Sequence, residues 1–281
     1  MSRNVAASVR ARLKQHADTR QEDFNLVLTR YGLERLLYRL SISPLASSYL
    51  LKGALLFSLW YDHVHRPTRD ADLLGMGSDD VDASVAAFRT ICSVALDDGI
   101  VFDTASIKGT EIRKDAGYGG VRIDIRAVLD GARITLQVDI GFGDAVTPAP
   151  DTIHYPVLLD DFPQPRLRAY PRHTVIAEKL HAICLLGMAN TRLKDYFDLD
   201  VLMREGAWNG PEVMEAIAAT FSRRKLPLPA TTPIGLSDAF AHDAGKQAQW
   251  GAFLKKNRLD AEPFAIIVQR LRKAVEAVGV Y

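Results

Sequence analysis

The spacing of apolar side chains changes along the chain, and each spacing predicts a different kind of element. Over roughly the first 40 residues apolar positions recur every three or four residues, which predicts helix up to the break at Ser41–Pro44. The apolar stretch Leu45–Tyr61 predicts a buried helix. Asp70–Leu74 predicts a short strand, and Asp79–Leu96 a helix with acidic side chains in its first turn.

From Val101 to Phe142 the period becomes two, and Asp130-Gly131 marks a hairpin turn, so we expect a meander of antiparallel strands. Thr147–Pro171 holds six of the 13 prolines and predicts an irregular connector between two modules. The remaining chain predicts helices over His173–Met188, Leu193–Arg204, Pro211–Arg224, Gln247–Lys256 and Glu262–Val278. The predicted organisation is an α/β domain over residues 1–165 and a helical C-terminal domain over residues 166–281.

Composition narrows the class of protein. The 281 residues are 48% hydrophobic and 25% charged, which is typical of a globular protein and excludes a mainly disordered, collagenous or coiled-coil chain. Cys92 and Cys184 form neither a disulfide framework nor a zinc site, and they favour a reducing compartment. No apolar run is long enough to span a membrane, and the N-terminus lacks the pattern of a signal peptide. We therefore expect a cytoplasmic protein with no membrane partner.

The near-neutral net charge of +1 hides a strong pattern. Residues 1–60 carry 9 basic and 4 acidic side chains, residues 61–165 carry 9 and 18, and residues 166–281 carry 17 and 12. An acidic centre between basic ends indicates cation binding in the middle of the chain and polyanion binding at its flanks. Chance variation between segments of this size is the alternative.

The sharpest chemical feature is Asp70-Ala71-Asp72. Residues i and i+2 of a strand project to the same face, so both carboxylates point one way. Two such anions repel unless a cation lies between them, and hard oxygen ligands of this kind suit Mg²⁺. The triplet on its own is also common in solvated loops.

A second acidic position, Asp139, lies among apolar neighbours in the later predicted hairpin strand. One interpretation is a salt bridge to Arg122, Arg126 or Arg133, because an unpaired buried charge is costly. The other is that Asp139 joins Asp70 and Asp72, so that three carboxylates hold two metal ions about 3.5–4 Å apart for an in-line phosphoryl transfer. The same role is less favoured for two further residues, Asp124 and Asp144.

Four further groups of residues are candidates for binding phosphate or metal. Lys52-Gly53 precedes the triplet, and a glycine there lets backbone N–H groups approach a phosphate. Lys179 lies among apolar neighbours, where a lysine either snorkels to the surface or neutralises a buried anion such as a triphosphate. Asp195 and Asp198 share a helix face next to Lys194, and their spacing alone favours local salt bridges over a functional role. The remaining candidate is the pair His63 and His65, which has no further ligand nearby in the sequence.

Together these residues resemble the AbiEii/AbiGii family of nucleotidyltransferase-like toxins from type IV toxin–antitoxin pairs. The resemblance spans about residues 24–205 and departs from the commoner Gly-Ser of the first motif, having Gly53-Ala54. It rests on five segments in the order of the family: Lys52-Gly53-Ala54, Arg66-Pro67-Thr68-Arg69-Asp70-Ala71-Asp72-Leu73-Leu74-Gly75, Val138-Asp139-Ile140-Gly141-Phe142-Gly143-Asp144, Glu178-Lys179-Leu180 and Lys194-Asp195-Tyr196-Phe197-Asp198-Leu199.

The resemblance implies an α+β fold with a DNA-polymerase-β-like nucleotidyltransferase core and a helical C-terminal domain. It implies that Asp70, Asp72 and Asp139 bind metal, that Lys179 contacts nucleotide phosphates, and that Asp198 is an essential acid. It further implies a cognate antitoxin, which in some pairs phosphorylates a Ser or Thr beside the first aspartate; here that residue is Thr68.

The function expected from these features is transfer of a nucleoside monophosphate from an NTP to an RNA acceptor, expected to be the 3′ end of tRNA, with two Mg²⁺ ions. Lys52, Gly53, Arg66 and Arg69 join Lys179 as candidate nucleotide-binding residues. Two alternatives stay open: a non-catalytic module of the same fold that binds RNA or protein, and a haloacid-dehalogenase-type phosphatase using Asp70 and Asp72. The phosphatase ranks last, because an apolar strand should lead into its first aspartate.

Overall fold

The computed structural model describes residues 4–61, 66–113, 119–204 and 210–281. His63 and His65 lie outside the described residues. The chain forms two compact units, the first of residues 1–143 and 151–169 and the second of residues 144–150 and 170–281. Each unit is described by itself. The domain boundary expected between residues 165 and 166 stays a prediction.

The N-terminal segment forms two helices, α1 (Val5–Arg20) and α2 (Phe24–Ile42), where the sequence predicted one helical stretch. The chain turns at Gln21, whose φ of 56° is left-handed and closes α1. Asp23 then starts α2 by accepting a hydrogen bond of 2.9 Å from the N–H of Leu26. The C-cap at Gln21 and the N-cap at Asp23 therefore divide the segment into two helices, although the helical spacing of apolar residues continues across them.

The predicted buried helix over Leu45–Tyr61 is wrong. This stretch contains the strand β1 (Tyr49–Lys52), between short 3₁₀ turns at Ala46–Ser48 and Gly53–Leu56, and then the one-turn helix α3 (Phe57–Trp60). All four residues of β1 are buried, so the strand has no polar face to show a period of two. A strand covered on both sides reads as a continuous apolar run, which periodicity cannot distinguish from a buried helix.

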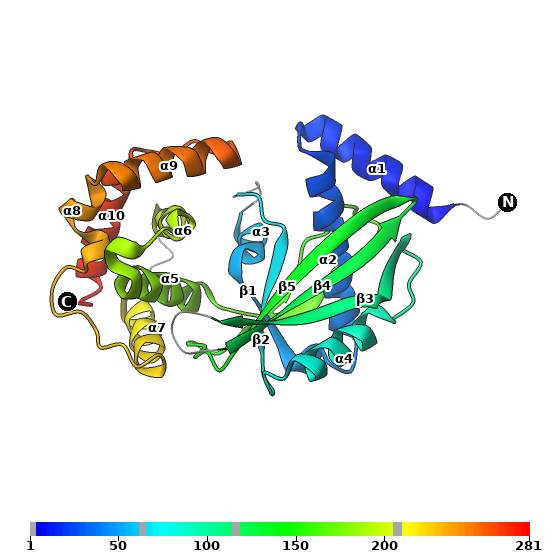
Figure 1. The fold of residues 1–281 in the computed structure, drawn as a ribbon, viewed down its shortest axis with the longest axis horizontal. Coiled ribbons are helices and arrows are strands. Elements are labelled where there is room, and N and C mark those ends of the chain that lie inside the picture. Colours follow the sequence, from blue (N-terminus) through cyan, green and yellow to red (C-terminus); the bar gives the residue numbers. More distant parts are fainter. Residues whose placement is uncertain (1–3, 62–65, 114–118, 205–209) are drawn as a thin grey trace. The chain divides into compact units, whose positions relative to one another are not determined.

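Within the described residues seven strands form one mixed sheet in the order β3-β4-β5-β2-β1-β7-β6 (Figure 1). The predicted meander is confirmed: β3 (Ile100–Arg113), β4 (Gly119–Leu129) and β5 (Ala132–Phe142) pair antiparallel. The triplet lies on β2 (Asp70–Gly75), which pairs parallel with β5 and antiparallel with β1. The predicted irregular connector instead adds β6 (Asp151–His154) and β7 (Arg166–Ala169), which extend the sheet beyond β1.

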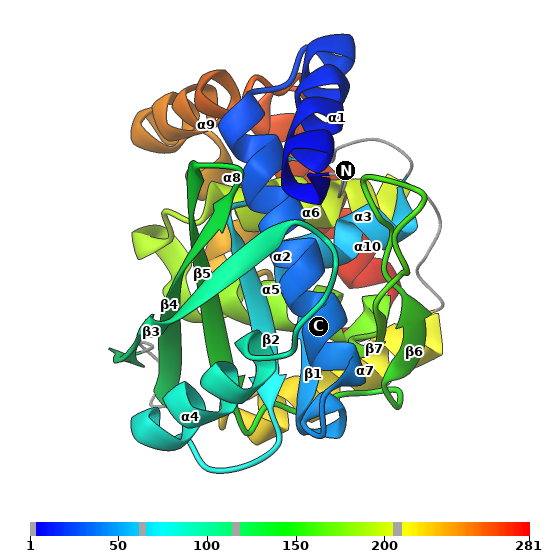
Figure 2. The same ribbon diagram turned by 90° about the vertical axis from the view of Figure 1, so that its right-hand side faces the viewer.

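One face of the long strands is covered by helices (Figure 2). The helices α2 and α4 (Val81–Cys92) contact these strands and each other. Side chains of β4 and β5 that face them, such as Ile123 and Leu136, are fully buried. The alternate side chains are polar and partly exposed, so the other face of the β3-β4-β5 meander is polar.

The second unit is helical, as the sequence predicted for this part of the chain. Its longer helices are α5 (Arg172–Leu186), α6 (Leu193–Arg204), α7 (Gly210–Arg223), α9 (Ala244–Asn257) and α10 (Phe264–Ala277). The one-turn helix α8 (Asp238–Ala241) was not expected. Aromatic rings fill the core, with Tyr196 stacked on Phe240 and edge-on to Phe264. No helix of the described chain is both long and apolar enough to cross a membrane.

Candidate active site

Four charged side chains occupy one row across four strands of the sheet. In register, Arg122 of β4 pairs with Asp139 of β5, and Asp139 pairs with Asp72 of β2. On the other side of β2, Asp72 pairs with Lys52 of β1. Residues paired in register project to the same face, so the row reads cation, carboxylate, carboxylate, cation. We call these four residues the charged row; Asp70, two residues before Asp72, projects to the same face.

The expectation that Asp139 lies on the same face as Asp70 and Asp72 is therefore met by the register of β2 and β5. On the opposite face of β2, Ala71 and Leu73 are buried. Neighbouring strands lie about 4.8 Å apart, so Asp72 and Asp139, which are paired in register, are direct neighbours on this face. The role of the three residues as metal ligands stays a prediction.

Asp139 has a strong partner, which is Arg122. The guanidinium donates from Nε to Oδ1 and from Nη2 to Oδ2 of Asp139, each at 2.8 Å. The bidentate bond to Asp139 raises the pKa of Arg122 above its ordinary value. Of the three arginines considered from the sequence, the salt bridge thus forms with Arg122 and not with Arg126 or Arg133. In the part of the chain that the structure describes, no group of three or more His, Cys, Asp or Glu side chains is arranged to hold a metal ion.

Gly53 makes room for the carboxylate of Asp72. Its φ of +75° is left-handed, and a Cβ built on it would lie 2.0 Å from Oδ2 and 2.7 Å from Cβ of Asp72. Any side chain at position 53 would fill the space that Asp72 uses. Two features therefore require glycine at position 53: its left-handed backbone angle and the close approach of the Asp72 carboxylate.

Thr68, the candidate phosphorylation site, lies in the segment just before β2. The Oγ1 of Thr68 donates a hydrogen bond of 2.6 Å to Oδ1 of Asp70. Arg66 is half-buried and Arg69 is exposed in the same segment. A group added to the hydroxyl of Thr68 would therefore lie next to the carboxylate of Asp70.

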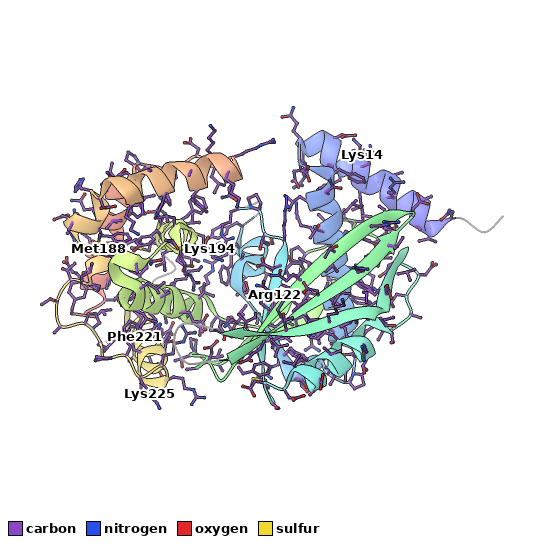
Figure 3. The ribbon with its side chains drawn as sticks, viewed as in Figure 1. Lys14, Arg122, Met188, Lys194, Phe221 and Lys225 are labelled. Carbon is purple, nitrogen blue, oxygen red and sulfur yellow. The ribbon has the colours of Figure 1, made fainter. Side chains whose placement is uncertain are left out.

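In the helical unit Lys179 neutralises two buried carboxylates. Its Nζ donates to Oδ1 of Asp195 at 2.9 Å and to Oδ2 of Asp198 at 2.7 Å. The side chains of Asp195 and Asp198 are 1% and 0% exposed, so their charges are stabilised by this lysine and not by solvent. Arg192 supplies a second cation to Asp195 at 2.8 Å. Lys194, labelled in Figure 3, is exposed. Among the described residues Asp195 and Asp198 form ion pairs with Lys179 and Arg192, and the local pairing expected with Lys194 is not among these pairs.

A second ion-pair cluster in this unit was missed from the sequence. Arg224, just after α7, donates from Nη2 to Asp144 and to Glu178, each at 2.8 Å. Burial disfavours the charge of Arg224, but the two carboxylates outweigh it and raise the pKa of Arg224. His181 packs edge-on against Phe221, and burial together with the charge of Arg224 lowers its pKa to about 4. Asp144 and Glu178, both in the motifs quoted above, thus bind an arginine of the same unit.

A signal for the Arg122–Asp139 pair was present in the sequence. The turn at Asp130-Gly131 pairs Leu129 with Ala132, and counting outward along the two strands brings Arg122 opposite Asp139. No comparable count links Arg224 to Asp144 and Glu178, because these residues come from separate elements.

The chain is similar to one protein family and to two solved structures. A family model described as "Nucleotidyl transferase AbiEii toxin, Type IV TA system" matches residues 35–277. The crystal structure of JHP933 from Helicobacter pylori is similar with a TM-score of 0.52 and 17% identity, over 90% of this chain and 94% of that one. A putative nucleotidyltransferase from H. pylori is similar with a TM-score of 0.52 and 18% identity, over 90% and 96% of the two chains. The comparison with curated proteins gives no match.

The two structural similarities show a shared fold, and the family match covers most of the chain. The chain belongs to the AbiEii family of nucleotidyltransferase toxins of type IV toxin–antitoxin systems.

Proposed function

We propose that this protein transfers a nucleoside monophosphate from an NTP to an RNA acceptor, the 3′ end of a tRNA, and thereby blocks translation in the cytoplasm. The observation that carries the proposal is the common face of Asp70, Asp72 and Asp139. On this proposal residues 1–165 are a DNA-polymerase-β-like nucleotidyltransferase domain and residues 166–281 a helical domain.

The donor set of Asp70 and Asp72 fits a hard divalent cation such as Mg²⁺, since both residues supply carboxylate oxygens from one face of β2. Two Mg²⁺ ions, when bound, would stabilise the charge that develops on the attacking and leaving oxygens. Asp139 is the candidate third ligand and general base. Because Arg122 donates to both of its oxygens, the bonds to Arg122 compete with binding of a metal ion or a proton by Asp139.

The candidate nucleotide-binding residues divide into two groups. Lys52, Gly53, Arg66 and Arg69 surround the triplet in the sequence, and each supplies a cation or an accessible backbone N–H for phosphate oxygens. Lys179 is proposed to contact the phosphates from the helical unit. Its bonds to Asp195 and Asp198 hold its ammonium group in place, which assigns Asp198 the role of orienting Lys179.

The cognate antitoxin is proposed to act through Thr68. A phosphoryl group on its Oγ1 would add about two negative charges beside Asp70, to which that oxygen is hydrogen-bonded at 2.6 Å. These charges would repel an incoming triphosphate and would change the anionic ligands available to a divalent cation at Asp70. Mass spectrometry of the protein co-expressed with its antitoxin tests this: phosphate on Thr68 supports it, and an unmodified Thr68 in a neutralised protein contradicts it.

The activity is tested by incubating the protein with labelled NTPs, Mg²⁺ and total tRNA. Label retained in RNA with the wild type and lost with Asp70→Ala supports the transferase. The matched control is Asp151→Ala, which removes an exposed carboxylate from the β6 strand of the same sheet and should leave incorporation unchanged. Absence of label with every NTP, in wild-type protein that is folded, contradicts the proposed activity.

One observation favours a second candidate, a non-catalytic module that binds RNA or a protein partner. Arg122 donates to both oxygens of Asp139, as expected for a carboxylate that serves in an ion pair. The assay above separates the two functions: a module of this kind binds RNA without incorporating label, and binding then persists in Asp70→Ala.

A further inference from the structure

A small pocket opens beside the sheet in the first unit, at the end where β5 begins. Its volume is about 240 Å³, smaller than the ~300–1,000 Å³ that holds a whole drug-sized ligand. The pocket is therefore large enough for a small group such as a phosphate, but not for a whole nucleotide-sized ligand. Leu28 of α2 and Ile134 of β5 line its apolar part.

The rest of the lining is polar and cationic. Arg69 and Arg133 both line the pocket, together with the polar residues Asn25, Thr29 and Thr135, and no acidic residue of the described chain lines it. Neither arginine has an ion-pair partner among the described residues. This differs from Arg122 and Arg224, whose guanidiniums bind carboxylates at 2.8 Å. Both arginines are exposed, and two guanidiniums that line one pocket without carboxylate partners give it a positive potential, which favours an anion.

Beside the pocket, no strand of the described chain pairs with residues 132–136 of β5 on the edge that faces β2. Pairing of β2 with β5 begins at Asp70 and Gln137, so residues 132–136 of β5 extend beyond the start of β2. A strand without a neighbour exposes backbone N–H groups, which are further donors for an anion. Arg133 lies four residues before Gln137, about 13 Å along the strand from the position next to Asp70.

We propose that this pocket, with Arg69 and Arg133 as its cations, binds a phosphate group of a substrate of the transferase. The proposal rests on the proposed function and adds Arg133, a residue outside the motifs of the family resemblance. The phosphate belongs either to the backbone of the RNA acceptor or to the NTP. The planar fork of each guanidinium matches phosphate oxygens, and the hydroxyl of Thr135 and the amide of Asn25 are further donors on residues that line the pocket.

Direct binding tests the proposal without catalysis. A short fluorescein-labelled RNA and a fluorescent NTP are each titrated with the wild type, Arg133→Ala, Arg133→Lys and the control Arg166→Ala. Arg166 is an exposed arginine on β7, outside the pocket, so its variant matches the change in charge. Thermal unfolding shows whether each variant is folded, and Arg133→Lys preserves the charge if Arg133→Ala does not fold.

If the phosphate is that of the acceptor, Arg133→Ala weakens RNA binding by roughly three- to tenfold and leaves NTP binding unchanged. The slope of log Kd against log salt then falls by about 0.7, the value for one phosphate of a single strand. Arg133→Lys retains the salt slope while losing part of the affinity. If the phosphate is that of the NTP, only NTP binding weakens.

Equal binding of both ligands by Arg133→Ala and Arg166→Ala overturns the proposal while the transferase function stands. A folded wild type that binds neither RNA nor NTP contradicts the proposed function itself, and the pocket proposal with it.

Discussion

Replacing Gly53 by alanine tests whether the position of Asp72 determines activity. The change has two separable costs. The first is the left-handed backbone, with φ of +75°, which costs about 1–2 kcal/mol for a residue with a Cβ. The second is steric: the new Cβ would lie 2.0 Å from Oδ2 of Asp72, whereas such contacts do not fall below 3.0 Å. The carboxylate must therefore move by about 1 Å.

Rotation of the Asp72 side chain does not relieve this contact, because Cβ of Asp72 is itself only 2.7 Å from the built atom. The start of the 3₁₀ turn after β1 has to move away from β2. A displacement of about 1 Å at a reacting centre can cost on the order of 100-fold in rate. We expect Gly53→Ala to lose about 100-fold in NTP transfer, and more than 2 kcal/mol of unfolding free energy.

Gly131 provides the matched control. It has the same backbone angle, φ of +76°, in the turn between β4 and β5, but a Cβ there meets no atom within 4 Å. Gly131→Ala should therefore lose only the backbone cost of about 1–2 kcal/mol and keep its transfer rate. Urea unfolding and the labelled-NTP assay measure both quantities. Transfer by Gly53→Ala within threefold of Gly131→Ala would refute the reasoning that Asp72 must stay where Gly53 allows it.

Three further predictions concern other charged groups. Lys179→Met should destabilise the protein by about 3–5 kcal/mol in urea unfolding, because it leaves Asp195 and Asp198 buried without this cation, and Asp198→Asn in the same chain should restore part of the loss. Arg122→Gln should bind Mn²⁺ several-fold more tightly by electron paramagnetic resonance, because it removes a cation and releases the oxygens of Asp139. Burial lowers the pKa of His181 to about 4 in the folded protein, so between pH 6.5 and 4 the unfolded chain binds a proton at His181 more readily than the folded protein does. The free energy of unfolding therefore decreases as the pH falls through this window. In His181→Leu, which has no such group, Tm should fall less steeply.

Each of these predictions has an outcome that contradicts it. A cost below 1 kcal/mol for Lys179→Met would mean that Lys179 does not stabilise the two carboxylates. Unchanged Mn²⁺ affinity in Arg122→Gln would remove Asp139 from the metal site. For the pH dependence, the control is His242→Leu, which changes an exposed histidine; the reasoning fails if its Tm profile and that of His181→Leu are the same.

The sequence determined the elements whose pattern is local. The meander from β3 to β5 has one buried and one exposed face, so its period of two was visible, and the two-residue turn at Asp130-Gly131 sets the register of Arg122 and Asp139. The common face of Asp70 and Asp72 follows from strand geometry alone. The helices of the C-terminal half were predicted from apolar spacing in the same way.

The tertiary structure decided what depends on partners distant in the chain. Tyr49–Lys52 is a strand only because β2 and β7 pair with its two edges, and its burial on both faces removed the alternation that identifies a strand. The pairing of Lys179 with Asp198 joins two helices, and no spacing rule within one helix predicts it. The place of Asp139 beside Asp72 depends on the parallel pairing of β5 with β2, which brings together residues from distant parts of the chain. Local periodicity records which face of an element is buried, but the neighbour that buries it is chosen by packing.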